Sequence, residues 1–330
     1  MELSAVSNEA STDGRPPWIV MGIRSAIPRQ GNSVRGMNEK AARTFLLTHA
    51  RIIDRRLAEI YLDGAANVEP VVHALEAYRN ADGGFGHGLE GDALAPESQP
   101  LAVDTAFALV DDLGAHTGAS FADLVTPTFT FLQAVSSPDG GLPIVLPSVA
   151  AYPRAEHWGD GEFPPGLNPT AAIVARARLL GPPHPWLDTA GAFCRRALEI
   201  PGSVADAHTA LCVLRLFETD PDRAWAEDEY DKLGARLTDL ALFQPMPDAG
   251  YGLTPLQFAP SPHSPRRRFF ASESIDAHLD ALEKAQQDDG GWPLTWPLTW
   301  LPPGPTALAN WRGIATLEAL RVLRAYGRIS

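Results

Sequence analysis

The chain has 330 residues, of which 45% are hydrophobic and 20% charged, a composition typical of a globular protein with a large core. Its net charge of −13 argues against nucleic acid and anionic membrane surfaces as partners, because both would repel an acidic protein. No apolar run reaches the roughly 18 residues that a membrane-spanning helix needs. The two cysteines, Cys194 and Cys212, make no disulfide framework, which favours a reducing cytoplasm.

Residues 1–36 are rich in Ser, Pro, Asn and Gly and lack sustained periodicity, so we expect a mobile N-terminal extension. From Met37 onward, apolar residues recur at intervals of three and four, which predicts amphipathic helices. β-branched residues never alternate over a long run, so strands are not expected. The sequence predicts one all-α domain over 37–330, with helices at 38–62, 68–80, 101–114, 119–135, 169–180, 185–199, 204–218, 223–243, 272–287 and 307–326.

Four of the connections between these helices share a pattern of aspartate, glycine and an apolar or aromatic residue. They read "YRNADGGFGHG", "AVSSPDGGLPI", "FQPMPDAGYGL" and "AQQDDGGWPL", and their aspartates are Asp82, Asp139, Asp248 and Asp289. Aspartate can close a turn, and glycine can adopt positive φ and let two backbones approach. Repetition at this scale predicts stacked helical hairpins, with the turn aspartates in a structural role.

The segment "QQDDGGW" resembles the glutamine–tryptophan repeat of the squalene-hopene cyclase and protein prenyltransferase β-subunit superfamily, and "NADGGFG" and "SPDGGLP" resemble weaker copies. The resemblance implies an α/α toroid of about five to six helical hairpins around a central cavity. Residues 82–106, together with the end of the chain, are also similar to a group of bacterial prenyltransferase or squalene-oxidase repeat proteins. On this expectation the inner helices begin near residues 101, 169, 204 and 307, and the helix at 38–62 closes the ring.

The segment "GHGLEGDALAPESQPLAVDTA" is the richest in candidate catalytic groups. It gathers His87, Glu90, Asp92 and Asp104 directly before and within a predicted inner helix. One interpretation is structural, because carboxylates close turns and favour the first turn of a helix. The other is catalytic: Glu90, Asp92 and Asp104 act as acids or handle a cation, with His87 as their partner.

A second cluster, Asp206 and His208 in "VADAHTALCVL", raises the question of a metal. In protein prenyltransferases an Asp-x-Cys pair on an inner helix and a later His bind zinc, and His208 here stands where that pair has its cysteine. Asp and His are competent zinc ligands, but residues two apart share no helical face unless the helix begins between them. A divalent metal, zinc or magnesium, therefore stays an open hypothesis, and no other cofactor is indicated. Cys212 is interpreted as core.

The expected substrate-binding groups are one arginine and a set of aromatic residues. Arg267 lies within "HSPRRRFF", which reads either as a solvated bend or as a clamp for diphosphate or carboxylate. Aromatic faces can stabilise a carbocation, although they also simply fill hairpin junctions. The candidates are Phe85, Trp158, Tyr251, Trp292, Trp296, Trp300 and Trp311.

Three functions compete. The first is an enzyme related to class II terpene cyclases or prenyltransferases, which acts on an isoprenoid or other hydrophobic small molecule through acid and carbocation chemistry. Against it, the Asp-x-Asp-Asp acid motif of those cyclases is absent from the sequence. The second is a glycosidase or lyase that uses paired carboxylates. The third is a non-catalytic binder of a hydrophobic ligand, for which a pocket without a buried acid would argue.

Overall fold

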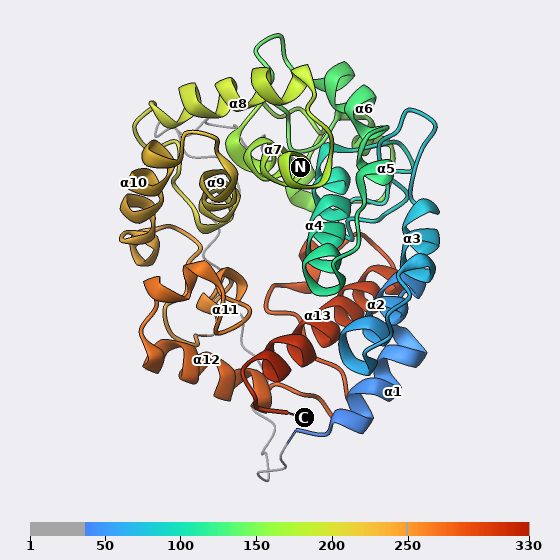
Figure 1. The fold of residues 1–330 in the computed structure, drawn as a ribbon. Helices are drawn as coiled ribbons and strands as arrows, with labels where there is room; N and C mark the ends of the chain where they lie inside the picture. The colour runs from blue at the N-terminus through green and yellow to red at the C-terminus, as the bar shows by residue number, and fades with distance from the viewer. Residues whose placement is uncertain (1–36, 249, 330) are drawn as a thin grey trace, which may run out of the picture.

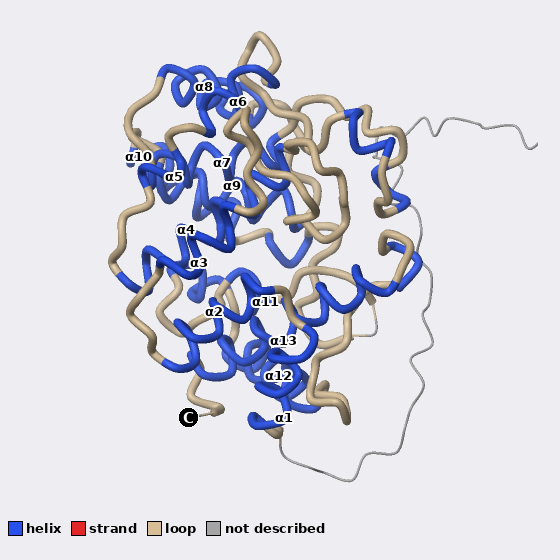
Figure 2. Tube along the Cα trace, turned by 90° about the vertical axis from the view of Figure 1, so that its right-hand side faces the viewer, coloured by secondary structure: helices blue, strands red, loops and turns tan. Residues whose placement is uncertain are grey.

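The computed structural model describes residues 37–248 and 250–329, and this part of the chain consists of helices and loops (Figure 2). Among the described residues, β-type pairing is limited to isolated bridges. The all-α prediction is confirmed, whereas the extension expected at 1–36 lies outside the described residues. The α-helices are α1 (Glu39–His49), α2 (Ile52–Asp63), α3 (Glu69–Glu76), α4 (Pro100–Thr117), α5 (Ala122–Val125), α6 (Thr128–Val135), α7 (Leu167–Leu180), α8 (Pro185–Leu198), α9 (Ala207–Thr219), α10 (Arg223–Gly234), α11 (Pro255–Phe258), α12 (Ser272–Lys284) and α13 (Pro305–Ala325).

The helices are arranged in a ring with an inner and an outer layer (Figure 1). Helices α4, α7, α9, α11 and α13 lie on the inside, and α3, α6, α8, α10 and α12 lie outside them. Helix α7, rich in small apolar residues, is buried almost all round, whereas α10 buries only one face. Inner neighbours pack directly on one another, α4 on α7 and α7 on α9. The two ends of the described chain meet where α1 and α2 pack on α13.

Each repeated turn joins an outer helix to the inner helix that follows it, and in the turns after α3 and α12 the first glycine makes a close backbone contact. Gly83 has φ +87°, and a Cβ there would lie 2.2 Å from the carbonyl oxygen of Pro127, at the start of α6. Gly290 has φ +92°, and its Cβ would lie 2.3 Å from the carbonyl oxygen of Ala41 in α1. Glycine is required at both positions, because any side chain would meet backbone as well as strain φ.

The turn aspartates hold these loops together. One oxygen of Asp82 accepts hydrogen bonds from the backbone N–H of Gly84, at 2.9 Å, and from the hydroxyl of Ser98, at 2.8 Å. Asp289 accepts from the N–H of Gly291, at 3.0 Å, and both its oxygens accept from the guanidinium of Arg312, at 2.7 and 2.8 Å. These contacts give Asp82 and Asp289 the structural role that the repeat predicts.

Several helices end earlier than their periodicity predicts. The segment expected as one helix over 38–62 forms α1 and α2, because the chain is extended at Ala50, where α13 crosses. A Cβ on Gly313 of α13 would lie 2.9 Å from the Cα of Ala50, so the backbone of α13 is in close contact with the break between α1 and α2. The helix expected over 223–243 ends at Gly234, and the short α11 has too few residues to show a period.

Candidate functional site

The loop between α3 and α4, which carries Glu90 and Asp92, is fixed at several points by hydrogen bonds to its backbone. Arg51 donates from Nη1 to the carbonyl oxygen of Leu89 at 2.8 Å, and a two-pronged ion pair with Asp54 orients its guanidinium. The carbonyl oxygen of Asp92 accepts from the N–H of Ala155 at 2.7 Å. The loop is therefore tied both to the start of α2 and to the segment that precedes α7.

Glu90 lies in a site that favours its neutral form. Burial raises the pKa of Glu90 to about 8, and the negative charge of Asp92 adds to this effect. The hydroxyl of Thr105, on α4, lies 2.9 Å from Oε2 of Glu90 and 3.1 Å from the carbonyl oxygen of Leu101. When the Thr105 hydroxyl donates its hydrogen bond to that carbonyl, its oxygen can accept a hydrogen bond from the O–H of a neutral Glu90. At neutral pH this carboxyl can therefore act as an acid.

Asp92 is the ionised partner of this pair. Burial raises its pKa to about 6, while a hydrogen bond of 2.8 Å from the indole Nε1 of Trp311 opposes the rise. Gly91 makes that contact possible, because a Cβ there would lie 2.6 Å from the same indole nitrogen. Nε2 of His157 lies 3.9 Å from Asp92 Oδ2, and burial lowers the pKa of His157 to about 4, so this imidazole is neutral.

A series of aromatic side chains runs from Trp311 to His157, and Asp92, which lies near both of these residues, closes it into a circuit. Trp311 contacts Trp296, with ring centroids 5.1 Å apart, and Trp296 contacts Tyr251 at 6.2 Å. Tyr251 contacts Trp300 at 5.1 Å, and Trp300 contacts His157 at 6.4 Å. We call these five residues, with Glu90, Asp92 and His208, the carboxyl–aromatic site. Its side chains come from segments far apart in the sequence, from the first turn of α9 and from the second turn of α13.

Tyr251, a member of this circuit, forms a second polar pair with His208. The hydroxyl of Tyr251 lies 2.9 Å from Nε2 of His208, and the two rings stack with centroids 5.8 Å apart. Burial raises the pKa of Tyr251, and the charges of Asp92, Asp206 and Glu90 add to it. Burial also lowers the pKa of His208, so a neutral imidazole meets a neutral phenol. The pair can accept or return a proton opposite the carboxyls.

The metal hypothesis for Asp206 and His208 is not supported by their geometry. Oδ1 of Asp206 caps α9 by accepting from the N–H groups of His208 and Thr209, at 2.9 and 3.0 Å. His208 Nδ1 lies 3.7 Å from that oxygen, and its Nε2 is bonded to Tyr251. Within residues 37–248 and 250–329, no group of three or more His, Cys, Asp or Glu side chains could hold a metal ion. Asp206 therefore orients His208 and the helix instead.

Asp104 is not part of the carboxyl–aromatic site. It pairs with Arg176 of α7 and lines a cavity of about 260 Å³ between α4, α7, α9 and the segment that follows α11. His87 is also separate: its backbone has φ +55°, its side chain is exposed, and its Nε2 lies 3.0 Å from Asn80 Oδ1. The expected acid triad is thus corrected to a pair, Glu90 and Asp92, without His87.

Three of the aromatic candidates have other positions. Phe85 is fully buried beneath the guanidinium of Arg79, so it belongs to the core. Trp292 is also core: its indole donates to the carbonyl oxygen of Leu282 at 2.8 Å, between α12 and α13. Trp158 packs beside His157, with centroids 4.4 Å apart, and its ring also contacts Phe163, at 5.9 Å, in a separate apolar cluster. Only Tyr251, Trp296, Trp300 and Trp311 are brought to the carboxyls.

Arg267 is likewise not a substrate clamp. Its guanidinium donates to the carbonyl oxygen of Phe270, at 2.6 Å, and to the hydroxyl of Ser272, at 3.0 Å, at the start of α12. Its neighbour Arg266 lines the cavity instead.

Sequence reasoning missed His157, Thr105 and two inner-helix arginines, Arg176 and Arg215. His157 stands in no repeat, so nothing local marked it. The arginines did carry a signal, since each interrupts an otherwise apolar stretch, "AAIVARARLL" and "LCVLRLFE". A cation in the middle of an apolar inner helix indicates either an internal ion pair or a ligand.

Comparison with known proteins adds little to this picture. No family model matches the chain, and no curated protein matches it. A solved structure described as a protein from Actinoplanes is similar at a TM-score of 0.49 and 14% sequence identity, over 87% of this chain and 97% of that one. Among the described residues, no helix has the length and apolar character to cross a membrane.

Proposed function

We propose that this protein is an enzyme that protonates a bound isoprenoid-like substrate, with Glu90 as the acid, and so starts a cyclisation or rearrangement through a carbocation. The observation that carries the proposal is the neutral Glu90 carboxyl, with a pKa of about 8, beside the ionised Asp92 and a circuit of aromatic rings. A carboxylic acid kept neutral by burial is the group that such chemistry requires.

The proposed reaction needs no oxidant or reductant. The O–H bond of Glu90 breaks as a C–H bond forms on a substrate alkene, which leaves a positive charge on the neighbouring carbon. The faces of Trp296, Trp300 and Trp311 stabilise that charge by cation–π attraction. The cation then loses a proton to His208 through Tyr251, or to the Glu90 carboxylate, and the substrate is isomerised.

A second candidate is a glycosidase or lyase, and the hydrogen bond between Tyr251 and His208 favours it. That pair makes one side of the carboxyl–aromatic site polar, which suits a hydroxylated substrate as well as a hydrocarbon. The carboxyl pair would then supply acid and base, and the tryptophans would stack on sugar rings. A non-catalytic carrier is the weakest of the three, because it gives no reason to place a neutral carboxyl beside a second acid.

The test is to incubate the purified full-length protein with geranyl, farnesyl and geranylgeranyl diphosphates and with squalene in deuterium oxide. Products are identified by gas chromatography with mass spectrometry. We expect a cyclised or rearranged product that carries one deuterium, because protonation starts the reaction. Glu90→Gln, which cannot donate this proton, should lose the activity.

The matched control is Glu97→Gln, because Glu97 is an exposed carboxylate of the same loop. This variant should keep the activity. Release of reducing ends from oligosaccharides, with no isoprenoid product, would replace the proposal by the second candidate. An isoprenoid that binds and is recovered unchanged would indicate a carrier.

A further inference from the structure

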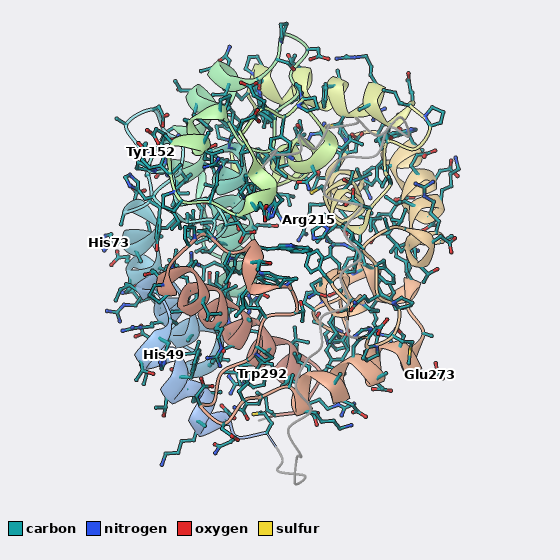
Figure 3. The ribbon with its side chains drawn as sticks, turned by 180° about the vertical axis from the view of Figure 1, so that it is seen from behind. His49, His73, Tyr152, Arg215, Glu273 and Trp292 are labelled. Atoms are coloured by element: carbon teal, nitrogen blue, oxygen red, sulfur yellow. The ribbon has the colours of Figure 1, made fainter. Side chains whose placement is uncertain are left out.

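Three arginines converge on the cavity that Asp104 lines. Arg176 comes from α7, Arg215 from α9, and Arg266 from η5 (Pro265–Phe269), and all three are among the lining residues. Asp104 is the one acidic residue of the lining. Seen with its side chains, the molecule has Arg215 at the centre of the ring, whereas His49, His73 and Glu273 lie at its periphery (Figure 3).

The three guanidinium groups differ in how fully protein groups satisfy them. Arg266 is fixed by a two-pronged pair with Glu218, at 2.8 and 3.0 Å, and also reaches the carbonyl oxygen of Phe258. Arg176 pairs with Asp104, but its buried Nε has no hydrogen-bond partner in the described part of the chain. One wall of the cavity is therefore rigid, and one buried donor is unused.

Arg215 is the least well neutralised of the three. Its nearest carboxylate oxygens belong to Glu218, at 3.4 Å, and Asp111, at 3.8 Å, and Glu218 already serves Arg266. Burial lowers the pKa of Arg215, and the charges of Arg266 and Arg176 add to this effect. A group with several donors in a plane, close to two other cations, suits an oxyanion.

Helix α9 contributes residues both to the cavity and to the carboxyl–aromatic site. His208, Leu211 and Arg215 are spaced by three and four residues, so they lie on one face of this helix. Leu211 and Arg215 line the cavity, whereas His208 belongs to the carboxyl–aromatic site. Seven residues of helix separate His208 from Arg215 by about 10 Å. A second link is α4, where Asp104 faces the cavity and the next residue, Thr105, contacts Glu90.

We infer that this arginine-lined cavity binds the anionic end of the substrate, a phosphate, diphosphate or carboxylate group, while the reacting carbon lies beside Glu90 in the carboxyl–aromatic site. The inference deepens the proposed function and rests on it for the position of the reacting carbon. The anion site itself does not depend on the reaction. Together with the carboxyl–aromatic site, this anion site would select a substrate that has an anionic group at one end and is otherwise uncharged.

The test is isothermal titration calorimetry of the full-length protein with inorganic diphosphate and, separately, with glucuronate. We expect saturable binding of at least one of these anions, weakened tenfold or more in Arg215→Met. Arg267→Met is the matched control, because that arginine is the neighbour of Arg266 in sequence but donates to Phe270 and Ser272 and is not among the residues that line the cavity. This variant should bind like the unmodified protein. Circular dichroism checks that each variant is folded, and Arg215→Lys provides a second, milder variant that keeps the charge but not the planar fork.

The outcomes separate the two proposals. Glu90→Gln should bind the anion normally even though it loses activity, so an anion site without isoprenoid chemistry is a distinguishable result. Preference for diphosphate would identify a phosphorylated substrate, and preference for glucuronate a sugar acid; either supports the site. No binding of either anion, or equal binding by Arg215→Met, would overturn the inference.

Discussion

Replacement of Glu90 by glutamine should remove a pH dependence from the stability of the protein. The folded state holds the Glu90 proton up to about pH 8, whereas the unfolded chain releases it near its ordinary value of 4.5. Between these values the folded state binds one proton more than the unfolded state. The free energy of unfolding must therefore fall as pH rises through this window. Glutamine is neutral in both states and cannot contribute such a slope.

The size of the effect follows from the pKa difference. Each pH unit within the window changes the free energy of unfolding by about 1.4 kcal/mol, so the interval from pH 5 to 8 gives about 4 kcal/mol for a fully enclosed group. The Glu90 side chain is only partly shielded from solvent, which reduces the expected change to about 2 kcal/mol. For a chain of this size, that corresponds to a relative change in Tm of roughly 3 °C.

Thermal unfolding followed by circular dichroism from pH 5 to 9 provides the assay. The Tm of Glu90→Gln should rise relative to that of the unmodified protein as pH increases, and the difference should level off above pH 8. Glu97→Gln, in the same loop but exposed, should run parallel to the unmodified protein. If Glu90→Gln and the unmodified protein have the same slope, the carboxyl is not held neutral, and the proposed acid loses its basis.

Three further substitutions test the structure around this acid and the closure of the ring. Trp311→Phe removes the indole donor that favours ionised Asp92, so the pKa of Asp92 should rise above about 6 in a carboxyl 13C NMR titration. Gly91→Ala should give the same rise with Trp311 still present, because its Cβ would displace the indole. Gly290→Ala should lower the free energy of unfolding in urea by more than about 2 kcal/mol, since it combines positive φ with a contact on the Ala41 backbone.

Two of these predictions have a specific control or a result that would contradict them. Gly64 also has positive φ, +69°, but nothing lies within 4 Å of its Cβ, so Gly64→Ala measures the cost of the backbone conformation alone. If Gly290→Ala costs no more than Gly64→Ala, the close contact with α1 has no energetic weight. An unchanged pKa of Asp92 in Trp311→Phe would mean that the indole does not influence this carboxylate.

The fold could be predicted from the sequence because its signals are local. Amphipathic spacing within one segment defines a helix, and the aspartate–glycine turns define where helices end. The prediction erred where a distant element intervened: the helix over 38–62 breaks at Ala50 because α13 crosses there, about 260 residues later in the chain.

The site was only partly predictable for the same reason. Glu90 and Asp92 lie in one loop, so the residue types of that loop indicate a candidate acid site. His157 is near Asp92 only in the folded structure, which no local pattern reveals. The sequence groups Asp104 with these acids because it lies in the same segment, at the start of a predicted inner helix. Successive residues of a helix point about 100° apart, so Asp104 faces Arg176, and Thr105 is the one that faces Glu90.

The tryptophans illustrate a further limit. Trp292 and Trp296 stand in two copies of the same four letters, yet one is core and the other contacts Tyr251. Trp292 takes the aromatic position of the repeated turn, where its backbone N–H donates to Thr316 at 3.0 Å, and Trp296 belongs to the loop beyond it. Letter patterns alone do not separate these positions; the place of each in the repeat does.

The meeting of the two ends of the described chain has a consequence for how the order of the helices could be rearranged. The side-chain amide of Gln286 accepts a hydrogen bond from the backbone N–H of Asn38, at 2.6 Å, and donates one to its carbonyl oxygen, at 2.9 Å. These bonds hold the start of α1 against the last repeated turn. A covalent link from the end of α13 to the start of α1 would join two helices that already pack against each other. The chain could then be opened at a different inter-helix loop, and the order of helices along the gene becomes independent of their order around the ring.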